Sequence, residues 1–174
     1  MKKLICIVGF FCLACSTGSN KRIAEEKLNF SYIDDAYLFF RNMRQATYNL
    51  QDLKEEGVRL YHHEDFEKDQ FFQVQMAVNW RINRAYMLIK LPDSVEKEQI
   101  RVFVERDSVF ELEQENWRRQ GELKFLTSIY NHILEKDSFS LVYGEERMPL
   151  FINSDQREAF RISMYDFYRL TALL

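Results

Sequence analysis

The sequence contains little cysteine, glycine or proline, and these shortages exclude several classes of protein. Only 5 glycines and 2 prolines occur among its 174 residues, which excludes a collagen-like or low-complexity chain. The 3 cysteines are Cys6, Cys12 and Cys15, all near the start of the chain. No cysteine follows Cys15, so the rest of the chain has no residue for a disulfide, a thiolate metal site or a thiol nucleophile. The core alone must therefore hold the folded part together.

An excess of positive charge is also missing. The chain has 24 basic and 27 acidic residues, a formal charge of −3, whereas a nucleic-acid-binding protein needs a concentrated basic face. Trp80-Arg81 and Trp117-Arg118-Arg119 place a ring that could stack on a base beside cations. In this acidic chain we interpret both as amphipathic packing, with the arginine stems lying along apolar surface. We expect no nucleic-acid partner.

The chain lacks the signatures of common enzymes. It has no Gly-x-Ser-x-Gly or His-Glu-x-x-His motif and no glycine-rich phosphate loop. Glu111 and Glu113 share one face of a predicted strand, but such pairs are most often surface charge in a chain this acidic. We expect no catalytic residues and no enzymatic activity. An enzyme of unrecognised type stays an alternative.

One cluster, His62-His63-Glu64-Asp65, contains residue types that bind zinc. Adjacent residues of a strand point to opposite faces, so His62 and His63 cannot easily share one ion. The third histidine, His132, is expected on the polar side of a helix. We interpret residues 62–65 as a solvated loop and expect neither a metal nor a cofactor.

Aromatic residues, in contrast, are abundant. The chain has 15 Phe, 9 Tyr and 2 Trp, and 47% of its residues are hydrophobic. This content supports a real core and excludes global disorder. Many of the aromatic side chains must be buried, and the remainder are candidates for a binding surface.

The first residues have the pattern of a secretory signal. Lys2 and Lys3 precede an apolar run from Leu4 to Leu13, which ends at the small residue Ala14. The run is about half the roughly 20 residues that span a bilayer. The pattern therefore predicts a targeting segment that is cleaved off. The residues at its end, Cys12 to Cys15, favour a more specific kind of signal over the alternatives, which are an ordinary secretory signal and an uncleaved membrane anchor.

The segment Cys12-Leu13-Ala14-Cys15 resembles the lipobox of bacterial lipoproteins, although Leu is usual where Cys12 stands. In that family the signal is cut before the cysteine, which then carries acyl chains such as palmitate. The resemblance implies lipidation of Cys15 and attachment to a membrane through those chains. Ser16 follows, with no retention aspartate, which by resemblance favours the outer membrane, on its periplasmic side.

Three parts of the chain follow from this interpretation. Residues 1–14 are the signal peptide, and residues 15–28 are the lipidated cysteine and a flexible polar tether. Residues 29–174 form a single globular domain, because no second linker or internal repeat occurs.

Periodicity predicts an α+β domain with an antiparallel sheet built from hairpins. A helical period predicts one helix at about 121–136 and a C-terminal helix at about 154–173, capped by Asn153 or Ser154. Pro149 places its strand at a sheet edge. The three expected hairpins join 72–80 to 85–91, 100–104 to 109–114, and 139–143 to 148–152.

Residues 36–53 fit two structures. A helical stripe runs from Ala36 to Leu53, with Asp34 or Asp35 as its cap, whereas the density of aromatic residues favours a strand. We favour a strand over 37–48. Residues 54–57 then break the chain.

Two groups of residues are candidates for partner binding, because Trp, Tyr and Arg are enriched in interface hot spots. We expect a non-enzymatic lipoprotein that binds another envelope protein, as an accessory subunit of a secretion or assembly machine. A lipoprotein that binds a small apolar ligand is the alternative. The edge strand at 148–152 could accept a partner strand. The candidates are Trp80, Arg81, Asn83 and Arg84 in one group, and Tyr165, Tyr168 and Arg169 in the other.

Overall fold

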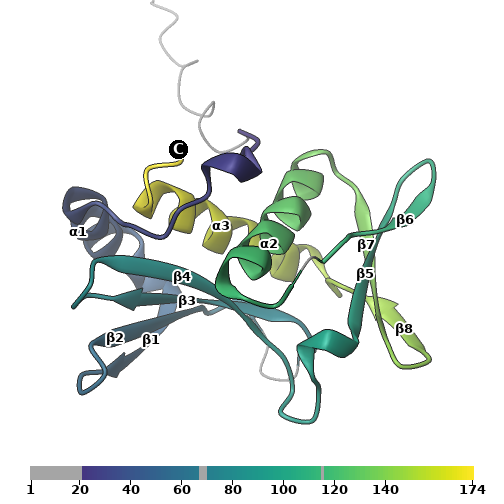
Figure 1. Cartoon of the computed structure of the whole chain (residues 1–174), viewed down its shortest axis with the longest axis horizontal. Coiled ribbons are helices and arrows are strands. Elements are labelled where there is room, and N and C mark those ends of the chain that lie inside the picture. Colours follow the sequence, from purple (N-terminus) through teal and green to yellow (C-terminus); the bar gives the residue numbers. More distant parts are fainter. Residues whose placement is uncertain (1–20, 67–69, 115) are drawn as a thin grey trace, which may run out of the picture.

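The computed structural model describes residues 21–66, 70–114 and 116–174, and these form an α+β fold, as predicted. Three α-helices pack with two four-stranded antiparallel sheets (Figure 1). The helices are α1 (Asp34–Met43), α2 (Arg119–Leu134) and α3 (Ser154–Leu170). The sequence pattern indicated one sheet, whereas the hairpins divide between two.

The first sheet has the order β1-β2-β3-β4 and the second the order β6-β5-β7-β8. Every pairing within them is antiparallel. The first comprises β1 (Tyr48–Leu53), β2 (Val58–His63), β3 (Gln73–Asn79) and β4 (Arg84–Lys90). The second comprises β5 (Ile100–Glu105), β6 (Val109–Glu111), β7 (Ser138–Tyr143) and β8 (Glu146–Pro149).

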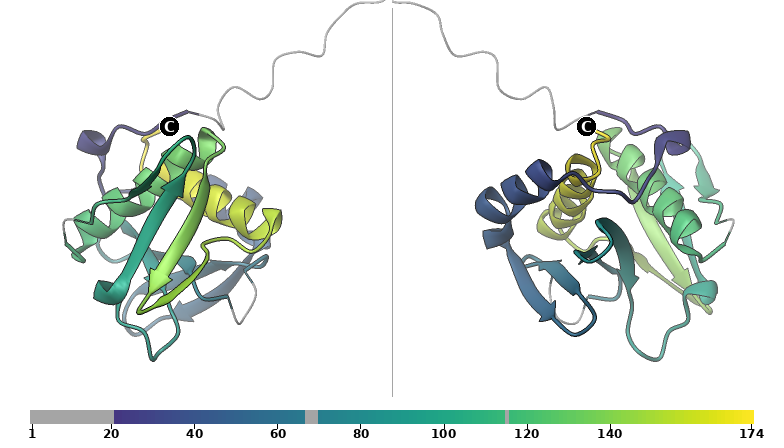
Figure 2. Two further views of the ribbon diagram at one scale, coloured as in Figure 1. Left: turned by 90° about the vertical axis from the view of Figure 1, so that its right-hand side faces the viewer. Right: turned by 60° about the vertical axis from the view of Figure 1, so that its left-hand side comes forward.

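Helices α2 and α3 lie beside each other in the angle between the two sheets (Figures 1 and 2). The apolar stripe of α3 explains this position, because Phe160, Met164 and Phe167 are fully buried. Val74, Met76 and Val78 of β3 are fully buried as well and belong to the same core. Helix α1 packs on α3 and closes one end of the first sheet.

Most of the predicted elements are confirmed. Strands β3 and β4 pair in register, with Met76 opposite Met87, and β5 pairs with β6 as the second hairpin. Strands β7 and β8 form the third, and Pro149 ends β8 at the free edge of its sheet. The Asn153 side chain caps α3 by accepting from the Gln156 N–H at 2.9 Å.

The prediction of a strand over 37–48 is wrong. Residues 34–43 form α1, and the strand begins only at Tyr48. Tyr37 and Phe40 lie three residues apart, and both are buried in the helix. Tertiary packing therefore outweighs the strand propensity of the aromatic residues. The alternative prediction of a helix is right up to Met43, but the predicted helical stripe ran on to Leu53, which lies in β1.

The boundary of the expected tether also changes. Ile23 and Leu28 are only 5% and 8% exposed and join the core, so residues 21–28 belong to the folded unit. A short 3-10 helix, Glu25–Lys27, lies between them. The expected signal peptide and Cys15 fall within residues 1–20, outside the described residues. No helix among the described residues combines the length and apolar character needed to cross a bilayer.

Candidate functional site

The first candidate group lies on the turn between β3 and β4. Trp80 is 41% exposed, and the Arg81 guanidinium carbon lies 5.5 Å from the centre of its ring. Arg81 also crosses to the neighbouring β1–β2 turn, where it donates to the Lys54 carbonyl at 3.3 Å. Its side chain packs on Gly57, so closely that a Cβ at Gly57 would lie 2.5 Å from it. Arg81 therefore joins two turns, and Trp80 is the exposed ring.

Asn83 and Arg84, of the same group, serve the fold. Asn83 adopts a left-handed backbone with φ +52°. Its carbonyl accepts from the Tyr32 N–H at 3.2 Å, and its Oδ1 accepts from the Tyr32 hydroxyl at 3.3 Å. The backbone of Arg84 forms an isolated bridge with Ser31, while its side chain is exposed. The turn is thus tied to the segment before α1.

The second candidate group is divided by the structure. Tyr168 is fully buried, and its hydroxyl donates to Thr127 Oγ1 at 2.9 Å, so the expectation that it belongs to an exposed patch is wrong. Tyr165 and Arg169 do come together. The Arg169 guanidinium carbon lies 5.9 Å from the Tyr165 ring centre and 4.5 Å from that of Phe39 on α1.

A surface that the sequence did not reveal surrounds Arg169. Phe39 is 41% exposed and Met43, one turn later on the same face of α1, is 66% exposed. A small cavity of about 140 Å³ opens beside Phe39 and Arg169 and is lined in part by Leu174. We call Phe39, Met43, Tyr165, Arg169 and Leu174 the α1–α3 surface. The spacing of Phe39 and Met43 was the available signal, and the choice of a strand for this segment concealed it.

The floor of this surface is rigidly held. Arg44 Nε donates to Asp166 Oδ1 at 3.1 Å, and the Tyr48 hydroxyl donates to Asp166 Oδ2 at 2.8 Å. The Asp166 carboxylate thus ties the end of α1 and the start of β1 to α3. A surface whose parts are fixed in advance loses less conformational entropy on binding.

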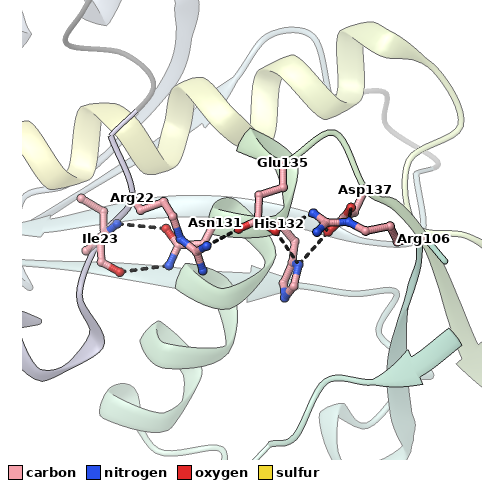
Figure 3. Close-up of polar contacts among 7 residues, drawn as sticks. All are labelled: Arg22, Ile23, Arg106, Asn131, His132, Glu135 and Asp137. Atoms are coloured by element: carbon pink, nitrogen blue, oxygen red, sulfur yellow. Dashed lines mark hydrogen bonds and ion pairs between the residues drawn. The ribbon is translucent and has the colours of Figure 1, made fainter. Parts of the chain in front are cut away.

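One cluster among the described residues has the composition of a metal site. His132, Glu135 and Asp137 offer ligand atoms within 4.8 Å of one another. Arg106 already donates to both carboxylates, and His132 Nδ1 lies 2.7 Å from Asp137 Oδ2 (Figure 3). Burial raises the pKa of Asp137, but hydrogen bonds from Arg106 and His132 outweigh it and leave this pKa lowered. The geometry describes a compensated ion-pair cluster that joins the β5–β6 turn to α2.

The other histidines are not in a solvated loop, which corrects that expectation. His62 and His63 lie on β2, on opposite faces, and His63 is 3% exposed. His62 Nε2 lies 2.7 Å from Gln73 Oε1. Burial lowers the pKa of both histidines.

The glutamate pair and the second tryptophan considered in the sequence analysis can also be placed. Glu111 and Glu113 are both exposed. Trp117 is half-buried, with its ring 5.7 Å from that of Phe125, which agrees with the packing interpretation.

A hollow lies beside the edge strand β8. It encloses about 650 Å³ between β7, β8 and the start of α3, and is lined by Phe139, Phe151 and Arg157 among others. Arg157 donates to the carbonyls of Asp137 and Ile133 at 2.7 and 3.3 Å. Burial lowers the pKa of this guanidinium.

Comparisons with protein-family models, with curated proteins and with solved structures find no match to this chain. The functional argument therefore depends on its own residues.

Proposed function

We propose that the protein is a non-enzymatic lipoprotein, anchored through acyl chains on Cys15 to the periplasmic side of the outer membrane. There it binds another envelope protein, as an accessory subunit of an envelope complex. The lipobox-like segment Cys12-Leu13-Ala14-Cys15 supports the anchor.

One observation carries the binding role. Arg169 lies against the rings of Phe39 and Tyr165 on a surface with exposed apolar side chains. A guanidinium over aromatic faces keeps free donors while its stem covers apolar area. Aromatic and arginine side chains of this kind supply most of the energy at protein interfaces.

The test is in-cell crosslinking followed by affinity purification and mass spectrometry. We expect a discrete partner with the wild type, and its loss with Cys15→Ala, which removes the acylation site. Phe39→Ala and Arg169→Ala should each lower its recovery about tenfold, the equivalent of about 1.4 kcal/mol. Circular dichroism should show that all variants are folded.

Two controls define the surface. Leu50→Ala removes a β1 side chain that is 42% exposed but lies outside the α1–α3 surface, and it should leave recovery unchanged. Trp80→Ala tests the β3–β4 turn separately. Undiminished recovery with Phe39→Ala and Arg169→Ala would exclude the α1–α3 surface, and a loss with Trp80→Ala alone would assign binding to the turn.

The hollow beside β8 favours a second candidate function, the binding of a small apolar ligand. Its volume of about 650 Å³ admits such a molecule, and Phe139 and Phe151 offer apolar contacts. The rest of the lining is mostly polar and includes Arg147 and Arg157, so the ligand would also carry a polar group. Native mass spectrometry of protein from its own host should then show an added mass that Phe151→Ala removes. An apo mass alone would exclude this function.

A further inference from the structure

The segment that enters the domain is held by a pair of hydrogen bonds. The Ile23 N–H donates to Asn131 Oδ1 at 2.9 Å, and Asn131 Nδ2 donates to the Ile23 carbonyl at 2.9 Å (Figure 3). The amide side chain of α2 thus satisfies both backbone groups of Ile23, as a neighbouring strand would. Ile23 is 5% exposed, so its side chain is docked as well. Residues 22 and 23 are therefore fixed to α2.

A single carboxylate then ties this entry point to the second sheet. Glu135 accepts from Arg22 and from Arg106, and Arg106 begins the turn between β5 and β6 (Figure 3). The turn and the entry point consequently lie at the same end of the molecule (Figures 1 and 2). We call Arg22, Arg106, Val109, Phe110 and Glu135 the anchor end.

The anchor end exposes apolar side chains. Val109 is 59% and Phe110 is 43% exposed, beside the partly exposed cations Arg22 and Arg106. Both cations are paired with Glu135, so it is the apolar tip of the turn that suits the boundary between lipid headgroups and acyl chains. The β1–β2 turn, residues 54–57, lies at the opposite end (Figure 1).

The length of chain before the entry point limits the distance from a lipid anchor. Seven steps separate Cys15 from Arg22, and seven residues span at most about 25 Å. If residues 15–28 were a free tether, the reach would be about twice this and the domain could turn in any direction. Docking of Ile23 roughly halves this reach and fixes the point on the domain from which the tether leaves.

We propose that the anchor end faces the membrane, with the Val109–Phe110 turn against the lipid headgroups and the β1–β2 turn directed away. The inference rests on the lipid anchor at Cys15 proposed above. The C-terminus lies close to the entry point (Figure 2), and Asn29 Nδ2 donates to the Thr171 carbonyl at 3.4 Å. Leu174, the C-terminal residue of the α1–α3 surface, therefore lies near the entry point.

The cysteine content makes the test direct. The mature chain has no thiol besides the acylated Cys15, so Ser108→Cys and Glu55→Cys each supply a unique site for a fluorophore. Both residues are exposed, one in the β5–β6 turn and one in the β1–β2 turn. The lipidated mature variants are placed in phospholipid vesicles that contain a headgroup-quencher lipid. We expect strong quenching at residue 108 and weak quenching at residue 55.

Two matched variants of α2 test whether the docking of Ile23 causes this orientation. Asn131→Ala removes both bonds to Ile23 and should abolish the difference between the two labels. Ser128→Ala, one turn earlier on α2, should preserve it. Equal quenching in the otherwise unchanged protein, or a difference that persists in Asn131→Ala, would overturn the inference.

Hydrogen exchange separates this inference from the anchor itself. The Ile23 amide should exchange slowly in the wild type and in Ser128→Ala, and rapidly in Asn131→Ala. Rapid exchange in the wild type overturns the docking. Slow exchange in a protein that does not bind vesicles and carries no acyl chain at Cys15 would instead overturn the lipid anchor, and the orientation with it.

Discussion

At the scale of single residues, Tyr168 shows why residue type alone does not identify a binding site. Tyr is typical of interfaces, but this ring is fully buried, 5.0 Å from the Tyr130 ring. Its hydroxyl bonds to Thr127, whose own hydroxyl donates to the Leu123 carbonyl at 2.7 Å. Burial raises the pKa of Tyr168 well above its ordinary value. The same helix exposes Arg169, so adjacent residues have opposite roles.

Removal of the buried hydroxyl should destabilise the protein modestly. Tyr168→Phe deletes the bond to Thr127 but keeps the ring, so the free energy of unfolding should fall by about 1 kcal/mol. Urea denaturation followed by circular dichroism measures this change. Tyr165→Phe is the control, because Tyr165 is only partly buried, and it should have no measurable effect. Equal stability of Tyr168→Phe and wild type would mean that the bond contributes nothing.

At the scale of elements, periodicity succeeded where one face of an element is buried and both ends carry local signals. Helix α3 has a buried stripe and the Asn153 cap, and β3 and β4 alternate on either side of a short turn. The β1–β2 hairpin was missed because β1 is an edge strand with mostly exposed residues, which leaves little hydrophobic pattern. Helix α1 was missed because its aromatic residues favour strands locally.

The cap of α3 should carry measurable stability. Asn153→Ala leaves the Gln156 N–H without its side-chain acceptor, and we expect the free energy of unfolding to fall by about 1 kcal/mol. Thermal and urea unfolding would both report the loss. Ser154→Ala is a matched control, since Ser154 Oγ donates to the adjacent, exposed Asp155 carboxylate at 3.3 Å and not to a backbone group of the first turn. An equal effect of the two substitutions would contradict the assignment of the cap.

At the scale of the whole molecule, burial and ion pairing make stability depend on pH in one direction. Burial lowers the pKa of His62 and His63 below the ordinary histidine value of about 6.5. Hydrogen bonds from Arg106 and Arg161 lower the pKa of Glu135 and Glu158 below 4.5. In both cases the unfolded chain binds more protons as the pH falls, so acidification favours unfolding.

We therefore expect stability to fall in two stages as the pH decreases. The histidines contribute their full share above about pH 6.5 and lose it as the pH falls through their lowered pKa values. The carboxylates contribute their full share above about pH 4.5 and lose it as the pH falls through their own lowered pKa values. Urea unfolding midpoints between pH 8 and pH 3.5 would resolve the stages.

The double variant His62→Gln, His63→Phe provides the control for the first stage. It should remove the decline between about pH 7 and pH 5.5 and keep the one at lower pH. A decline of wild-type size in this variant would show that other groups cause it.

The candidate site was predictable only in part. Arg169 and Tyr165 were found because arginine and tyrosine adjoin an apolar stripe, but Phe39 reaches Arg169 from 130 residues earlier in the chain. No local pattern reports such a meeting. For the same reason the sequence did not show that residues 22 and 23 are docked rather than part of a tether, because Asn131 lies 108 residues from Ile23.

The sequence by itself determined the α+β class, three hairpins, two helices and the resemblance of the first residues to a lipoprotein signal. All of these depend on spacing within a few neighbouring residues, which side-chain periodicity and turn chemistry control. The tertiary structure decided that 34–43 is a helix, that two sheets form, and that Tyr168 is buried while Phe39 is exposed. It also decided where the chain enters the domain. These outcomes depend on free energies of burial and hydrogen bonding between segments distant in the sequence, and such energies exist only once the chain is folded.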